Sequence, residues 1–207
     1  RRGLKVTATD ASTEMLARAR QRAGAEGLME AIRFFQWDLG ALDPSGLPPQ
    51  PTDGYGVVFS NFGALNCLSD RGHLAELLAG WLQPGGKAVF VVMGPWCPWE
   101  IAWHLTHGQV RTAFRRLRKG AGAHIGQGRS VRVWYPSPGR LRREFSAYFR
   151  SLKVAGIGAF LPPSYLYQIV ERFPQFFAGV KTLDLKLGHL FPLNWLNDHY
   201  LIVMERR

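Results

Sequence analysis

The distribution of apolar residues divides the first half of the chain into segments of two kinds. Apolar runs of strand length occupy residues 4–9, 32–37, 55–61 and 87–93. Between them, residues 12–24 and 73–82 repeat apolar positions at helical spacing. Strands that alternate with helices in this way predict an α/β fold with a doubly wound sheet.

The second half of the chain begins with a longer insert and then alternates again. Five large apolar residues of the insert fall on one face of a single predicted helix: Trp99, Trp103, Val110, Phe114 and Leu117. Strands are predicted at 130–135, 152–158 and 199–205, and helical segments at 139–149 and 162–188. We therefore expect one domain over residues 1–207, with a helical lid insert over residues 96–129.

The composition is that of a globular protein, and its cysteines indicate the cellular compartment and whether a metal is bound. Of the 207 residues, 46% are hydrophobic, and no apolar run approaches the ~20 residues that span a bilayer. The two cysteines, Cys67 and Cys97, belong to no metal-binding or disulfide pattern. We therefore predict a cytoplasmic protein without a bound metal.

The positive charge of the chain is concentrated in one segment. Residues 111–153 contain 12 Lys or Arg and one acidic residue, whereas the rest of the chain contains 14 residues of each sign. Four of these arginines oppose the apolar face of the predicted insert helix. Such a segment can follow nucleic-acid phosphates, lie on an anionic membrane surface, or form a solvated face, and the sequence leaves these open.

Two predicted strands end in a carboxylate, and both aspartates are candidates for binding a nucleoside. Ligands of open α/β sheets bind outside the carboxyl ends of the strands. Asp10 follows the first strand and can accept hydrogen bonds from both hydroxyls of a ribose. Asp38 lies between Trp37 and Leu39, which suits an adenine ring and its amine. Each aspartate alone is also explained as a residue that begins a helix or caps a turn.

Four motifs in a fixed order extend this pattern. They are T-A-T-D-A-S-T-E-M-L at 7–16, F-F-Q-W-D-L at 34–39, G-Y-G-V-V-F-S-N-F-G at 54–63 and L-Q-P-G-G-K-A-V-F-V-V at 82–92. The motifs resemble the second to fifth strand motifs of class I S-adenosylmethionine (SAM)-dependent methyltransferases. The last predicted strand is similar to part of the antiparallel hairpin that closes that fold.

The resemblance implies SAM as the cofactor and in-line transfer of its methyl group to an acceptor. By the resemblance, Asp10 binds the ribose, Asp38 accepts from the adenine amine, and Asn61 lies where the fourth family strand opens toward the methyl group. The full set of implied SAM-binding residues is Asp10, Ala11, Asp38, Leu39, Asn61 and Phe62. No general base is assigned, because an acidic acceptor does not require a strong one.

The first family strand and its glycine-rich cofactor loop have no counterpart in the sequence. Only Arg1, Arg2 and Gly3 precede the first predicted strand, whereas that loop precedes the ribose carboxylate. The glycine-rich residues 120–128 follow a basic helix, so their context indicates a linker. We therefore expect the 207 residues to be the C-terminal part of the domain, to fold poorly alone and to bind SAM weakly.

The insert and one later loop supply the candidates for the acceptor site. Residues 93–100 leave the fifth family strand at the expected methyl-transfer edge. The candidate substrate residues are Trp96, Trp99, Glu100, Trp103 and Tyr165. The rival interpretation is that the tryptophans only pack the insert against the sheet, and that Tyr165 only follows a rigid Pro-Pro turn. We predict a small or lipid-like acceptor, and the type of methylated atom stays open.

Three other functions stay open at this stage. An RNA methyltransferase would use the basic residues 111–153, although no RNA-binding module is recognisable. A non-catalytic methyltransferase-like remnant would account for the absent cofactor loop. A nicotinamide-dependent oxidoreductase also binds ribose at a strand-end acid, but it does not normally combine Asp38 with a Pro-Gly-Gly turn.

Overall fold

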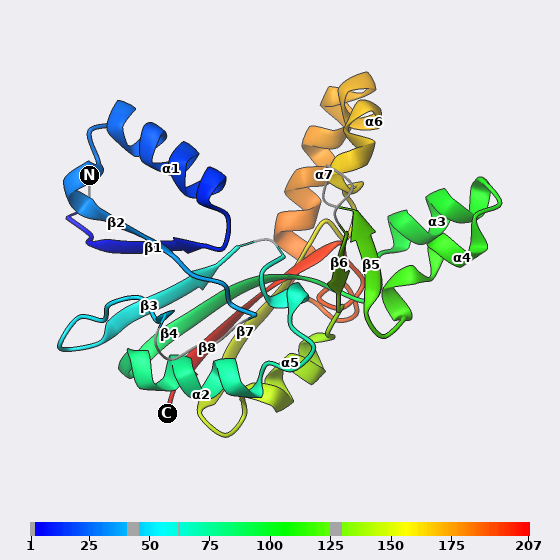
Figure 1. The fold of residues 1–207 in the computed structure, drawn as a ribbon. Helices are drawn as coiled ribbons and strands as arrows, with labels where there is room; N and C mark the ends of the chain where they lie inside the picture. Colours follow the sequence, from blue (N-terminus) through cyan, green and yellow to red (C-terminus); the bar gives the residue numbers. More distant parts are fainter. Residues whose placement is uncertain (1–2, 41–45, 62, 125–129) are drawn as a thin grey trace. The chain divides into compact units, whose positions relative to one another are not determined.

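The chain folds into two compact units, Arg1–Thr52 and Asp53–Arg207 (Figure 1). The computed structural model describes residues 3–40, 46–61, 63–124 and 130–207. The strands are β1 (Val6–Asp10), β2 (Ile32–Gln36), β3 (Tyr55–Ser60), β4 (Leu82–Met93), β5 (Ala121–His124), β6 (Ser130–Val133), β7 (Phe149–Ile157) and β8 (His199–Arg206). The α-helices are α1 (Thr13–Ala25), α2 (Gly72–Trp81), α3 (Pro98–Thr106), α4 (Val110–Ala113), α5 (Pro138–Phe145), α6 (Tyr167–Arg172) and α7 (Pro174–Leu187).

The first unit is a two-stranded parallel sheet with one long helix. β1 pairs with β2 from Val6 opposite Ile32 to Asp10 opposite Gln36. The crossover between the strands is α1, whose N-terminus is capped by Ser12. The Ser12 hydroxyl accepts a hydrogen bond from the Met15 N–H at 3.2 Å, which satisfies a backbone donor that the helix leaves without a partner. The register brings the carboxyl ends of both strands to the same edge.

The second unit contains a four-stranded sheet in the order β3-β4-β8-β7, seen side by side in Figure 1. β3 and β4 are parallel, and β8 runs antiparallel to both β4 and β7. The core of the sheet is formed by alternate side chains that are almost fully buried, namely Phe90, Val92, Tyr200, Ile202 and Met204. This alternation is the period of two that one buried face of a strand requires.

The predicted α/β architecture is confirmed, with different bounds for two elements. β4 begins at Leu82, which pairs with Tyr55, so the L-Q-P-G-G motif already belongs to the strand. The helix predicted at 139–149 ends at Phe145, and β7 begins at Phe149 because that residue pairs with Arg206 of β8. Pairing partners far away in sequence therefore set both boundaries.

The single amphipathic helix predicted for residues 98–119 is wrong. α3 ends at Thr106, and Gly108 then adopts a φ of 70°, a left-handed conformation that ends the helix. The short α4 and a 3₁₀ turn at Arg115–Leu117 follow. Because the break changes the direction of the chain, the Arg116 side chain is buried instead of lying on a cationic face.

The linker predicted at 120–128 is wrong for residues 121–124, which form β5 and pair antiparallel with β6. Residues 125–129 lie outside the described residues, as do residues 43–45 of the loop that precedes β3. Within the part of the chain that the structure describes, no helix is long and apolar enough to cross a membrane.

Candidate active site

The carboxyl edge of the first unit carries both predicted nucleoside-binding aspartates. Asp10 ends β1, and Asp38 follows β2 by two residues, so parallel pairing brings them to one edge. The Trp37 N–H donates to the Asp10 carbonyl at 3.0 Å, which continues the pairing beyond the strands. Both aspartate side chains are exposed to solvent.

One oxygen of each aspartate orients the loop that follows it. Oδ1 of Asp10 accepts from the Ser12 N–H, and Oδ1 of Asp38 accepts from the Gly40 N–H, both at 2.8 Å. Among the described residues, Oδ2 of each carboxylate makes no hydrogen bond. Two fixed carboxylates with an oxygen toward solvent are chemically suited to the hydroxyls and the amine of an adenosine. Ala11 and Leu39 follow them directly, and the Ala11 carbonyl accepts from the Gln36 amide at 3.1 Å.

The second unit has its own carboxyl edge, where four chain segments meet. β3 ends at Ser60, β4 at Met93 and β7 at Ile157, and β8 begins there because His199 pairs with both Met93 and Ile157. Asn61 follows β3 and is exposed. The predicted cofactor residue Phe62 lies outside the described residues.

Backbone hydrogen bonds fasten the loops at this edge to one another. The Gly94 N–H donates to the Asp198 carbonyl at 3.4 Å, and the Asp198 N–H donates to the Gly158 carbonyl at 3.2 Å. The fully buried Asn66 adds a side-chain bridge, because its amide donates to the Met93 carbonyl at 3.0 Å and to the Trp134 carbonyl at 2.7 Å. The edge is therefore rigidly defined by its own polar groups.

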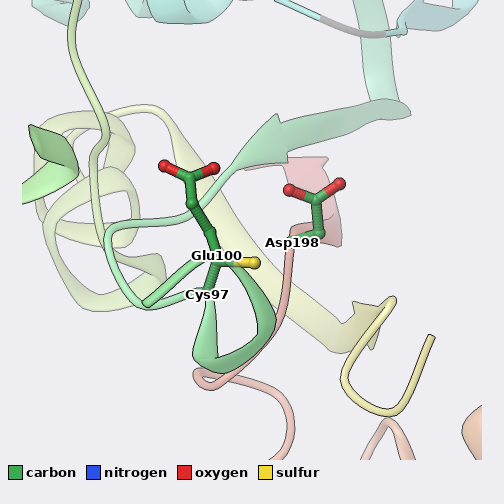
Figure 2. Close-up of side chains that lie close together, drawn as sticks. All are labelled: Cys97, Glu100 and Asp198. Carbon is green, nitrogen blue, oxygen red and sulfur yellow. The ribbon is translucent and has the colours of Figure 1, made fainter. Parts of the chain in front are cut away.

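A buried ionic cluster lies at the same edge. Glu100, in the first turn of α3, is 1% exposed, and Arg116 is 6% exposed. Arg116 Nη2 lies 2.7 Å from Oε2 of Glu100 and 2.6 Å from Oδ1 of Asp198. Arg116 also donates to the Asp198 carbonyl at 2.9 Å. Figure 2 shows Cys97 and Glu100 at the start of α3 beside Asp198, which directly precedes β8.

Two further candidates for the acceptor contact this cluster or its supporting loop. The Tyr165 hydroxyl lies 3.4 Å from Oε2 of Glu100. The Trp99 indole N–H donates to the Phe160 carbonyl at 2.8 Å. The loop that carries Phe160 is held in turn by the buried carboxylate of Asp184, which accepts from the backbone N–H groups of Gly158 and Phe160, each at 2.9 Å. α7 therefore supports the surroundings of Trp99.

The two remaining tryptophans have other contacts. Trp96 is exposed, and its carbonyl accepts from the Asn197 N–H at 2.9 Å. Trp103 contacts His107 at the C-terminal end of α3, with ring centroids 4.3 Å apart and the ring planes tilted by 36°. Tyr165 therefore bonds Glu100 directly, whereas Trp99 and Trp96 bond the loops beside the cluster. Among the described residues, Trp103 makes its polar contacts with Thr106 and His107.

Charge pairing outweighs burial in setting the ionisation of the cluster. Burial alone would raise the pKa of Glu100, but hydrogen bonds from Arg116 and Arg115 hold it below its ordinary value. Burial alone would likewise raise the pKa of Asp198, but His199 and Arg116 hold it below its ordinary value. Burial raises the pKa of Cys97 to about 11, so its thiol stays protonated at neutral pH.

The arrangement of potential ligands around Cys97 does not require a metal ion. Donor atoms of Cys97, Glu100 and Asp198 lie within 4.8 Å of one another. However, the guanidinium of Arg116 lies between the two carboxylates and supplies the positive charge that an ion would otherwise supply. A thiol with a raised pKa is also a poor ligand. We therefore assign the cluster as an internal ion network.

Sequence reasoning identified Glu100 and missed its main partners. The predicted helix placed Arg116 on a cationic face whose partner stayed open, and neither Asp198 nor Asn66 is a candidate in the sequence. A buried ion pair between positions 16 residues apart, with a third member 82 residues away, leaves no periodic signal in one sequence. The sequence signal that could indicate a buried ion pair is the acidic Glu100 within an otherwise apolar, tryptophan-rich segment.

Residues 1–86 match the family model described as a methyltransferase domain. Among solved structures, the chain is similar to a SAM-dependent methyltransferase from Mesorhizobium loti, with 20% identity and a TM-score of 0.54 over 98% of this chain and 80% of that one. The CcbJ methyltransferase from Streptomyces caelestis is 14% identical, with a TM-score of 0.57 over 99% of this chain and 80% of that one.

A third similar structure is geranyl diphosphate methyltransferase in complex with SAM. It is 13% identical, with a TM-score of 0.56 over 99% of this chain and 70% of that one. At identities this low, the structural similarity establishes the shared fold alone. No curated protein matches the sequence. The comparisons agree on two statements: residues 1–86 are similar to a methyltransferase domain, and the chain has the fold of SAM-dependent methyltransferases.

Proposed function

We propose that this methyltransferase acts on a small-molecule acceptor that binds at the carboxyl edge of the second unit. The observation that carries the proposal is the buried network of Glu100, Arg116 and Asp198 at that edge. Ligands of α/β sheets bind at the carboxyl ends of strands, and a rigid polar network there holds nearby side chains in fixed orientations.

We also propose roles for the first unit. Asp10, with Ala11 beside it, would hold the ribose of SAM, and Asp38 with Leu39 would hold the adenine. The family resemblance also assigns Asn61 and Phe62, which belong to the second unit, to SAM binding. The cofactor supplies an already activated methyl group, so the chain's own residues need only bind, orient and exclude water. Both aspartates meet the first requirement, because each is exposed and has one oxygen fixed by its loop.

The acceptor is proposed to contact Trp99 and Tyr165, with Trp96 and Trp103 nearby. The buried Glu100 is proposed to hold these surroundings in place through its ion pairs. Aromatic side chains around a few polar groups favour a compact organic acceptor, and a lipid-like one is the finer form of the proposal. Residues 96–129 would act as a lid within a single domain of residues 1–207. We place the protein in the cytoplasm, in keeping with two cysteines that form no disulfide.

The basic segment gives less support to a nucleic-acid acceptor. Several of its arginines already pair with carboxylates: Arg115, Arg116, Arg140 and Arg150. Arg116 is buried and unavailable to a phosphate backbone. Internal pairing therefore accounts for part of the positive charge that made RNA or an anionic membrane surface plausible partners.

The test combines cofactor binding with turnover. Calorimetry should detect SAM binding to the full-length protein in preference to NAD, and S-adenosylhomocysteine should form when a panel of small organic acceptors is added. Preference for NAD would indicate an oxidoreductase, and binding of neither cofactor would indicate a remnant without catalysis. Methylation of RNA but of no small molecule would contradict the proposed acceptor class.

A further inference from the structure

Arg115 occupies an unusual position beside the buried network. Its Nε donates to Oε1 of Glu100 at 2.8 Å, so the guanidinium meets the carboxylate with its side and not with its end. The Arg115 side chain is 40% exposed, in contrast to its neighbour Arg116 at 6%. Among the described residues, the two terminal nitrogens of Arg115 make no hydrogen bond. Four N–H donors therefore point away from Glu100.

Arg116 pairs with two carboxylates, whereas Arg115 pairs with one of the same two. Arg116 bonds both Glu100 and Asp198, whereas Glu100 is the only carboxylate that pairs with Arg115 among the described residues. Further basic side chains of the same segment, Arg111, Arg118 and Lys119, are exposed. The two arginines and two carboxylates of the network together carry no net charge, so the additional positive charge of the segment lies on these exposed side chains.

Two tyrosines lie close to the ion pairs of Arg115 and Arg116. Tyr165 shares Glu100 with Arg115 through the 3.4 Å contact of its hydroxyl, and the Tyr165 side chain is exposed. Tyr135 lies under the guanidinium of Arg116, 5.3 Å from ring centroid to the guanidinium carbon. Burial raises the pKa of both hydroxyls, so both stay protonated, and the Tyr165 hydroxyl donates to Glu100.

We propose that Arg115 is the specificity residue of the acceptor site and that the acceptor carries an anionic group, a carboxylate or a phosphate. This inference rests on the proposed function. The terminal N–H pair of Arg115 would bind two oxygens of the anion in parallel, which is the geometry in which a guanidinium recognises these groups. Glu100 fixes the guanidinium plane from behind, so little side-chain freedom is lost on binding.

The test observes Arg115 directly, without methyl transfer. The Nε–H signals of ¹⁵N-labelled full-length protein are recorded by NMR, and the Arg115 signal is assigned by its loss in Arg115→Gln. Phenyl phosphate, benzoate and the neutral isostere benzamide are then titrated in a phosphate-free buffer. We expect saturable shifts of the Arg115 signal with one or both anions and none with benzamide. Which of the two anions binds more tightly separates a phosphorylated acceptor from a carboxylic one.

Arg118→Gln is the matched control, because it removes the same charge from an exposed position three residues away. The loss of one charge-assisted bidentate contact should weaken anion binding by about tenfold in Arg115→Gln, and by less than about twofold in Arg118→Gln. Arg115→Lys keeps the positive charge but lacks the paired N–H donors of a guanidinium, so it should also bind the anions weakly. If Arg115→Gln does not fold, weak anion binding by Arg115→Lys tests the same inference.

Equal weakening in Arg115→Gln and Arg118→Gln, or equal shifts with benzamide, would overturn the inference. The proposed function is tested separately by SAM calorimetry on the same sample. Bound SAM without an anion response at Arg115 would remove only this inference. An anion response without SAM binding would leave the Arg115 site standing and contradict the proposed methyl transfer.

Discussion

Arg116 donates a 2.6 Å hydrogen bond to the carboxylate of Asp198, although 82 residues separate the two in sequence. This contact ties the insert after β4 to the start of β8, and it leaves the same guanidinium bonded to Glu100. A buried arginine that bridges two carboxylates is therefore the link between the insert and the sheet edge.

Removing Arg116 should destabilise the protein strongly. In Arg116→Met, two carboxylates lose their shared cation in a buried environment, and we expect a loss of about 3–5 kcal/mol in the free energy of unfolding. Urea denaturation followed by circular dichroism measures it. The control is Arg18→Met, which breaks an exposed pair with Glu14 and should cost at most about 0.5 kcal/mol. Similar costs for both variants would contradict the role of the network.

The network should also make stability sensitive to acid. The pKa values of Glu100 and Asp198 are lowered in the folded state, so the unfolded chain binds protons more readily. Their contribution is fully present above about pH 4, where unfolded carboxyl groups titrate, and is lost as the pH falls through the lower folded values. Unfolding free energies measured from neutral to acid pH should show this decline.

Glu100→Gln tests which carboxylate is responsible for the acid sensitivity. This variant lacks one of the two groups and should lose less stability between neutral and acid pH than the wild type, although it starts from a lower value. Glu14→Gln, at the exposed pair on α1, should retain the wild-type decline. A wild-type decline in Glu100→Gln would mean that other groups produce it.

Asp10→Ala should weaken SAM binding to the full-length protein by about 1–3 kcal/mol, the usual effect of losing a charge-assisted acceptor. Asp38→Ala should cost less, because an adenine also gains apolar contact. Calorimetry measures both, with Glu14→Ala as an exposed carboxylate of the same unit that should have no effect. An unchanged dissociation constant in Asp10→Ala would refute the ribose assignment.

Trp103→Ala tests the proposed lid. Trp103 lies in the last turn of α3 and contacts His107, so its removal should leave the sheet intact. Once an acceptor is identified, its KM should rise several-fold while the KM for SAM changes little. Equal effects on both KM values, together with a lower melting temperature, would favour a purely structural helix.

The two cysteines should react very differently with iodoacetamide. Cys97 is buried, and burial raises the pKa of its thiol to about 11, whereas Cys67 is exposed. At pH 8, mass spectrometry should find Cys67 alkylated and Cys97 protected until the protein is unfolded. Rapid modification of native Cys97 would show that the start of α3 opens easily.

The sequence by itself determined the alternation of strands and helices and the strand-end aspartates. These features depend on local patterns, because a buried strand needs an apolar run and a parallel pair places its carboxyl ends together. Asp10 and Asp38 could therefore be placed at one edge before any coordinates, and the pairing of β1 with β2 confirms that placement.

Only the tertiary structure decided how the insert is built and where its charges lie. Helical spacing alone could not show that the chain turns at Gly108, and so it placed Arg116 on a face open to solvent or to an anionic surface. The burial of Arg116 depends on Glu100, 16 residues earlier, and on Asp198, 82 residues later. A buried charge is stable only beside its partners, and which partners meet is fixed by the whole sheet order β3-β4-β8-β7 and not by any local segment.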